Sequence, residues 1–234
     1  MAYTPPTSRE EYTMDNRSTT RLLLICGVIG PLLFMIVALV EGATRPGYVA
    51  WRDFISELSL SDQGWEQIAN FIVSGLLFIA FAVGLRQALR TGKGATAGPI
   101  LLMMFGLFLI LSGIFVTDSS TGYPSGAPTG QLAANTLHGK LHGISGLLAF
   151  TCLAAACFVM ARRFAGNPNW KGWTALSVIC GLLIVVGFTL SLAAGLLGWP
   201  LAGLFQRLAV IAGWGWVALL AWRLLNKAES SASS

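Results

Sequence analysis

The chain has 234 residues, of which 55% are hydrophobic and only 11% are charged, with a formal net charge of +5. Soluble domains carry about 25% charged residues, so this composition excludes an ordinary soluble globule. The charges fall in short clusters between apolar runs of about 20 residues, the length that crosses a bilayer. The basic residues flank these runs and form no continuous basic surface, which argues against nucleic acid as a partner. We therefore expect one compact membrane domain.

Six apolar segments predict an all-α polytopic membrane protein with six transmembrane helices in one bundle. The segments are rich in Leu, Ile, Val, Ala, Phe and Gly and show no period-two alternation, which excludes strands. Residues 1–20 are polar and are expected to form a disordered or surface-lying cytoplasmic tail, with a second tail at 226–234. The membrane domain of residues 21–225 has predicted spans at about 21–40, 65–85, 97–116, 139–161, 173–197 and 201–225.

Lysine and arginine residues mark one side of this bundle. Connections and ends that are rich in these residues stay in the cytoplasm, according to the positive-inside rule. The other side carries only Arg45, Arg52, Lys140 and Arg207. The remaining eleven of the 15 are Arg9, Arg17, Arg21, Arg86, Arg90, Lys93, Arg162, Arg163, Lys171, Arg223 and Lys227. Both termini are therefore predicted to be cytoplasmic.

The first outer connection, residues 41–64, contains the segment WRDFISELSLSDQGW. Asp53 and Glu57 are four residues apart, a spacing that predicts a short amphipathic helix in the membrane interface, anchored by tryptophans at both ends. Two alternatives stay open. The helix is solvated, or it brings Ser56 and Glu57 to the mouth of the bundle.

The second span carries Glu66, Asn70 and Ser74 at intervals of four residues. A polar stripe on an apolar helix is expected to face other helices. Hydrogen bonds between helices explain it without any chemistry. The functional alternative is that Asn70 contacts a substrate.

Arg207 lies a turn or two inside the sixth span. An arginine at that depth is costly unless it reaches the interface or finds an anion. We expect it to pair with Glu57, Asp53 or Asp118. Binding of an anionic lipid or substrate headgroup is the functional version of the same prediction.

The connection that begins at Asp118 ends in both histidines of the chain, His138 and His142. Histidines four apart share one helix face, and such a pair binds zinc in metalloproteases. Asp118 is the natural third ligand, and this ligand set would suit Zn, Mn or Fe. Alternatively, the histidines hydrogen-bond to carbonyls or to Asp118, or titrate as a proton-sensing pair. The same helix carries small residues that predict close helix approach: Gly139, Gly143, Ser145 and Gly146.

Four motifs occur in a fixed order along the chain: RDFISELS after the first span, an Asp ending the third, HGxxH opening the fourth and GLFQR in the sixth. In this order they resemble the membrane family catalogued as domain of unknown function 998. The resemblance covers about residues 22–225 and brings no assigned activity. Gln206 stands where that family often has an acidic residue, which weakens the case for a local ion pair. The resemblance marks Ser56, Glu57, Asp118, His138, His142 and Arg207.

Two functions fit these features. We favour a non-enzymatic accessory, sensor or carrier protein of the bacterial cytoplasmic membrane, with an outward-facing polar cluster that stabilises the bundle or moves protons. Its expected partners are the lipid bilayer and an anionic lipid or a membrane protein.

The alternative is a metal-dependent membrane hydrolase that acts on a lipid or lipid-linked substrate. The chain looks loosely like membrane-embedded hydrolases of the alkaline ceramidase type, which combine a Ser, an Asp and an HxxxH helix, although those have seven spans with the motif in the last. In this alternative, Arg207 and Asn70 contact the substrate, while Glu57 and Ser56 are catalytic. The metal ligands would be His138, His142 and Asp118.

Overall fold

The computed structural model describes residues 8–89, 91–127 and 136–230, and within these ranges it contains helices and no strands. Each of the six long helices includes a stretch long and apolar enough to cross a membrane, so the predicted spans are confirmed. Two short 3-10 helices, η1 (Ile55–Leu60) and η2 (Pro168–Trp170), lie in connections. The long helices are α1 (Ser8–Thr44), α2 (Trp65–Leu89), α3 (Ala97–Ile114), α4 (Leu137–Phe164), α5 (Trp173–Leu197) and α6 (Ala202–Ser230).

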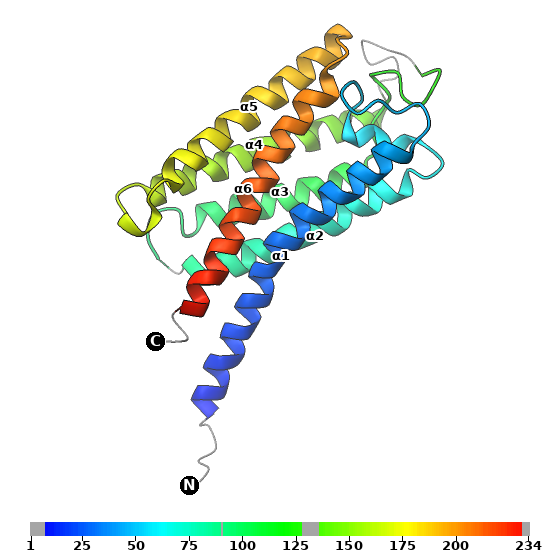
Figure 1. The fold of residues 1–234 in the computed structure, drawn as a ribbon. Helices are drawn as coiled ribbons and strands as arrows, with labels where there is room; N and C mark the ends of the chain where they lie inside the picture. The colour runs from blue at the N-terminus through cyan, green and yellow to red at the C-terminus, as the bar shows by residue number, and fades with distance from the viewer. Residues whose placement is uncertain (1–7, 90, 128–135, 231–234) are drawn as a thin grey trace.

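The helices form a closed ring in chain order. Each packs against its neighbours in sequence, and α1 completes the ring by packing against α6 (Figure 1). Six antiparallel helices return the chain to the side where it began. The start of α1 and the end of α6 therefore lie at the same end of the bundle. Their placement in the cytoplasm stays a prediction.

Helix α1 begins at Ser8, so residues 8–20 are helical and not disordered, while their place as a cytoplasmic tail stays a prediction. No glycine or proline interrupts the chain between Ser8 and Gly27. A helix already formed by the span extends at one hydrogen bond per added residue, whereas starting a helix is costly. The polar segment therefore continues the helix. Residues 226–230 continue α6 in the same way.

Close helix packing occurs at α2 and α3. A Cβ atom placed on Gly75 would lie 2.6 Å from the backbone oxygen of Gly106, and the reverse distance is also 2.6 Å. Real Cβ atoms do not come this close to a carbonyl oxygen, so these two helices require glycine at their crossing.

Trp214 of α6 occupies the centre of the ring. Its ring centroid lies 5.0–6.0 Å from those of Phe34, Phe78, Phe105 and Phe150, which come from four other helices. Such tilted and edge-to-face arrangements are the favoured geometries for aromatic pairs. The cluster fills the middle of the bundle and forms the floor of the outer half.

Candidate functional site

The segment η1 enters the mouth of the bundle, and most of its residues are buried. The prediction of a solvated interfacial helix is therefore wrong, and the alternative that placed Ser56 and Glu57 at the mouth is confirmed. Ile55 and Leu58 provide the apolar contacts that hold the segment there, at 2% and 0% exposure. The flanking Trp51 and Trp65 remain exposed.

The Glu57 carboxylate is fully buried and joins the first outer connection to the second. Its Oε1 accepts hydrogen bonds from the backbone N–H of Ser120 at 2.7 Å and of Thr121 at 3.0 Å. Its Oε2 accepts from the N–H of Phe54 at 3.0 Å and contacts the Thr121 hydroxyl. Burial raises the pKa of the Glu57 carboxyl above its ordinary value, although these hydrogen bonds offset part of the rise.

Asp53 lies beside Glu57 and is equally buried. Its carboxylate accepts from the Arg52 guanidinium at 2.6 and 3.0 Å and from the N–H of Val49 at 2.6 Å. The Thr121 hydroxyl lies 2.9 Å from Asp53 Oδ1 and so lies between the two carboxylates. Asp53, Glu57 and Thr121 therefore form a network of polar groups with satisfied partners at the outer end of the bundle, which favours a structural role. We call this network, together with Arg207 and its partners, the outer cap.

Arg207 does not pair with the carboxylate of Glu57, Asp53 or Asp118, contrary to the prediction. Its guanidinium donates instead to the backbone oxygens of Ala50, of Asp53 at 3.0 Å and of Gly203 at 3.1 Å. It also donates to the Tyr48 hydroxyl at 2.6 Å.

These carbonyl oxygens gather around Arg207 because the 48–54 loop folds over the start of α6. The N–H groups of Gly203 and Leu204, unpaired within the helix, donate to the backbone oxygens of Arg52 at 3.0 Å and Trp51 at 2.8 Å. Burial raises the pKa of Tyr48 to about 12, so its hydroxyl keeps its proton and lies 3.1 Å from the Phe54 oxygen as a donor. Arg207 thus anchors a loop.

Asp118 caps the start of α4. Its carboxylate accepts from the N–H of Thr136 at 3.0 Å and from the Thr136 hydroxyl at 2.7 Å. The Thr136 hydroxyl in turn accepts from the N–H of Gly139. A negative charge at a helix N-terminus is favourable, so this position gives Asp118 a structural reason to be buried in part.

The two histidines of α4 have different surroundings. His142 Nδ1 lies 2.9 Å from the backbone oxygen of Ser112 and 2.8 Å from that of Phe115. A ring nitrogen that faces carbonyl oxygens carries the proton, as the alternative of hydrogen bonding to carbonyls predicted. His138 is exposed, and its ring lies 5.8 Å from that of Phe115.

The structure does not assemble the predicted metal ligands. Over the described ranges, no group of three or more His, Cys, Asp or Glu side chains is arranged to hold a metal ion. His142 uses Nδ1 as a donor, and both oxygens of Asp118 accept from Thr136. The prediction of Zn, Mn or Fe at His138, His142 and Asp118 therefore gains no support from the geometry.

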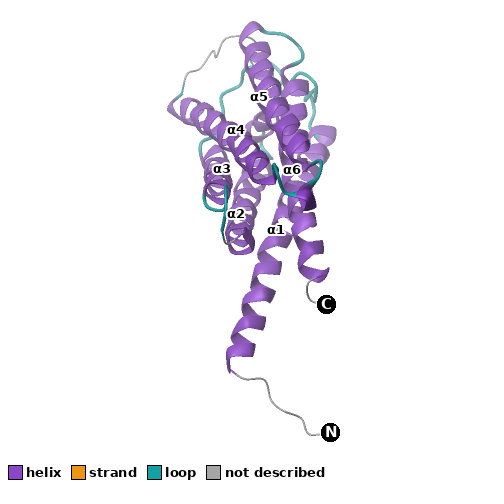
Figure 2. Ribbon diagram, turned by 90° about the vertical axis from the view of Figure 1, so that its left-hand side faces the viewer, coloured by secondary structure: helices purple, strands orange, loops and turns teal. Residues whose placement is uncertain are grey.

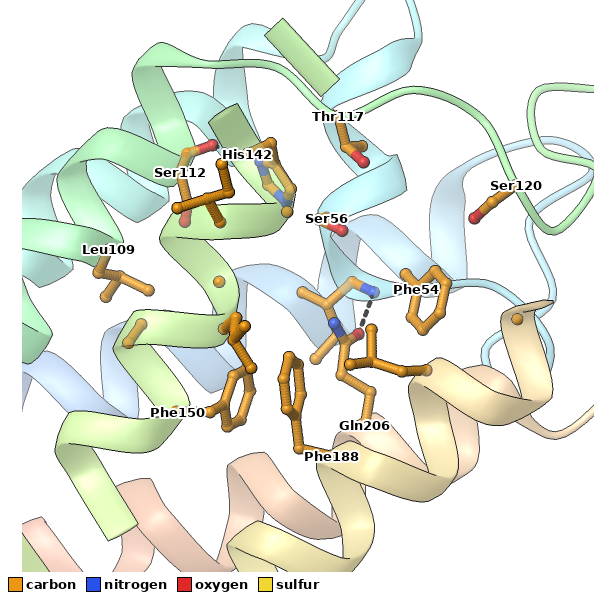
Figure 3. A pocket seen from close by; sticks show the side chains of 18 of the residues that line it. Phe54, Ser56, Leu109, Ser112, Thr117, Ser120, His142, Phe150, Phe188 and Gln206 are labelled. Atoms are coloured by element: carbon orange, nitrogen blue, oxygen red, sulfur yellow. Dashed lines mark hydrogen bonds between the residues drawn. The ribbon is translucent and has the colours of Figure 1, made fainter. Parts of the chain in front are cut away.

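A cavity of about 550 Å³ lies in the outer half of the bundle, and all six long helices contribute to its wall (Figure 3). Gln206 enters it from α6 and accepts from the N–H of Ile55 at 2.7 Å. The floor and sides are apolar and include Phe34, Phe71, Leu109, Phe150, Phe188, Val210 and Trp214. Polar side chains gather at the outer end: Ser56, Ser112, Thr117, Asp118, Ser120, Lys140 and His142.

Most of the predicted small-residue surface of α4 faces this cavity. Only part of it contacts a neighbouring element. A Cβ atom on Gly143 or Gly146 would meet nothing within 4 Å, so the prediction of close helix approach at these two positions is wrong. Only Gly139 lies in tight contact, against the Asp118 carboxylate. The missing side chains of Gly143 and Gly146 leave space where a larger residue would fill the cavity.

The cavity reaches the lipid-facing surface between α4 and α5. The axes of these two helices diverge towards their outer ends (Figure 2), and further in the rings of Phe150 and Phe188 stack with 4.2 Å between centroids. Four apolar side chains that line the cavity are also 42–56% exposed, which marks the opening: Ile144, Leu147, Leu192 and Leu196.

The remaining predicted site residues lie away from this cavity. Asn70 donates to the backbone oxygen of Phe34 at 3.2 Å and accepts from Ser74, so the stripe on α2 does serve contacts within and between helices. Glu57 and Arg207 belong to the outer cap. Their predicted catalytic and substrate-binding roles stay untested.

The comparisons with known proteins give a family and nothing closer. A family model described as a protein of unknown function, DUF998, matches residues 28–223. No curated protein and no solved structure matches the chain. Since the family match covers most of the chain and reaches into all six candidate spans, the protein belongs to the DUF998 family of membrane proteins.

Proposed function

We propose that this protein is a non-enzymatic lipid-binding protein, a carrier or sensor in the bacterial cytoplasmic membrane with both termini inside. The hydrocarbon chain of one lipid enters the central cavity sideways, between α4 and α5. One observation carries this proposal: an apolar cavity of about 550 Å³ opens between two membrane-spanning helices, where the surrounding medium is lipid.

The size and lining of the cavity support this choice of ligand. Ligand cavities have volumes of about 300–1,000 Å³ and combine apolar walls with a few polar groups. Here apolar side chains form the floor and sides of the cavity, and the polar side chains lie at its outer end (Figure 3). This polarity matches that of a lipid of the outer leaflet, with its chain inside the bundle and its headgroup at the membrane surface.

The headgroup contacts supply the selectivity. A lipid chain gains little hydrophobic free energy on leaving an equally apolar bilayer, so packing and polar contacts decide which lipid binds. Lys140 is an exposed cation that lines the outer end of the cavity, with the Ser56 and Ser120 hydroxyls near the same end. We therefore propose an anionic headgroup at Lys140, in place of the role first expected for Arg207.

The hydrolase alternative uses the same cavity, because Ser56, His142 and Asp118 all line it. Across the described residues, however, no hydrogen bond joins the Ser56 hydroxyl to a histidine or carboxylate that would activate it. A nucleophilic serine requires such a base within reach. The geometry therefore favours binding.

Native mass spectrometry tests the proposal. The wild-type protein, purified in mild detergent, is expected to retain a lipid adduct that Gly146→Leu loses, because the leucine side chain projects into the cavity and obstructs it. Gly215→Leu is the matched control, since Gly215 lies on α6 away from the cavity and also has nothing within 4 Å of an added Cβ. Equal lipid adducts in all three folded proteins would overturn the proposal.

A further inference from the structure

A second groove lies on the outside of the bundle, between the outer halves of α1 and α2. Its volume is about 560 Å³, and it is separate from the central cavity. Ile36 and Val73 on its walls are 58% and 44% exposed, so the groove is open to lipid. The apolar walls consist of Leu33, Ile36, Val37, Val40, Trp65, Ala69 and Val73.

The outer end of this groove is acidic. Glu41 and Glu66 both line it. Glu41 is 3% exposed, and neither of its carboxylate oxygens has a hydrogen-bond partner in the described chain. A buried carboxylate without hydrogen bonds is costly, so this group points to a donor that a ligand supplies.

Arg45 does not meet this need. Its guanidinium donates to the Ser61 hydroxyl at 2.6 Å, to the Gln63 backbone oxygen at 2.8 Å and to Glu66 at 3.0 Å. It approaches Glu41 only to 3.6 Å, which is an ion pair without a hydrogen bond.

The surface that the cluster presents is negative. Two carboxylates face one guanidinium, and the Arg45 side chain is 2% exposed whereas that of Glu66 is 41% exposed. A ligand in the groove therefore meets carboxylate first, next to apolar walls that continue inward along the helices. This combination fits a positively charged headgroup with N–H donors, attached to a hydrocarbon chain.

We infer that the α1–α2 groove binds a phospholipid whose headgroup ends in a primary ammonium group. The ammonium donates to Glu66 and Glu41, and an acyl chain lies along the apolar walls. Phosphatidylethanolamine has this chemistry. Phosphatidylcholine carries a cation without N–H donors, and phosphatidylglycerol is anionic.

Competition among these three lipids tests the inference. The purified protein is mixed with equal amounts of the three, all with the same acyl chains, and the adducts are measured by native mass spectrometry. The wild type is expected to favour phosphatidylethanolamine over the other two by about tenfold, the effect of one charge-assisted hydrogen bond. Glu66→Gln and Glu41→Gln are expected to lose this preference.

Three further variants make the result specific. Val73→Trp fills the groove without removing an acid and is expected to lose the preferred adduct. Asp62→Asn removes an exposed acid at the same end of the bundle, outside the groove, and is expected to retain it. Gly146→Leu, which obstructs the central cavity, is also expected to retain it, so failure of one proposal is distinguishable from failure of the other. A wild type without the preference, or a preference that survives both glutamine substitutions, would overturn the inference.

Discussion

At the scale of single residues, Glu57 has the largest structural effect that the contacts predict. It accepts hydrogen bonds from the backbone N–H groups of Phe54, Ser120 and Thr121, for which the described residues offer no other acceptor. Glu57→Ala leaves these donors buried and unpaired, at a cost of about 1–3 kcal/mol each. We expect a large fall in the melting temperature of the detergent-purified protein, with Asp62→Ala as an unaffected control. A small change in Glu57→Ala would contradict this role.

The stability of the protein is also expected to depend on the ionisation of Glu57. Because burial raises its pKa in the folded state, its stabilising contribution is complete below the unfolded value of ~4.3 and is lost as pH rises through the folded value. Glu57→Gln, which cannot ionise, removes this dependence. Melting temperatures measured from acid to neutral pH are expected to fall less steeply for Glu57→Gln than for wild type. Parallel curves would show that Glu57 does not titrate in this range.

The histidines separate the two functional hypotheses. His142 donates from Nδ1 to backbone oxygens, so our account predicts that His142→Ala changes stability without changing metal content. Elemental mass spectrometry of wild type, His138→Ala and His142→Ala measures this directly, in protein prepared without a histidine-rich tag. Near-stoichiometric Zn, Mn or Fe in the wild type, lost in both variants, would contradict this account and make the hydrolase alternative the leading one.

At the scale of helices, the glycines show what a sequence can and cannot predict. The stripe of small residues on α4 predicts packing against a neighbouring helix, but Gly143 and Gly146 face open space. Gly75 and Gly106 belong to no small-residue motif in the sequence, yet they form the α2–α3 crossing. Glycines at helical spacing predict either that a neighbouring helix approaches closely or that a cavity lies beside the helix. Only the arrangement of helices decides between the two.

Paired substitutions on two helices test this distinction. Gly75→Leu is expected to prevent stable folding, because a Cβ at that position would already lie 2.6 Å from the backbone oxygen of Gly106. Gly143→Leu is expected to fold with a melting temperature close to that of wild type. Size-exclusion chromatography in detergent and thermal unfolding provide the measurements. Similar behaviour of the two variants would argue against the described packing.

At the scale of the whole molecule, the six spans could be predicted because bilayer length and apolar composition leave few alternatives for a lipid-embedded chain. The contacts of the outer cap could not be predicted from the sequence. Its partners Glu57 and Thr121 are separated by 64 residues, and Arg207 and Tyr48 by 159, so no local pattern indicates their contacts. The same reason explains the partners of Arg207: its charge predicts a carboxylate acceptor, but backbone oxygens also accept, and no residue type in the sequence marks their position.

The central claim is that a lipid chain occupies the cavity, and photo-crosslinking from inside it is the most direct measurement. Val210 is 2% exposed and lines the floor, so a benzophenone amino acid at this position reaches lipid only if a chain enters the bundle. Leu220, on the same helix and fully buried outside the cavity, is the control. In membranes we expect a lipid adduct at position 210 and none at 220. No adduct at 210, or equal adducts at both positions, would contradict the account.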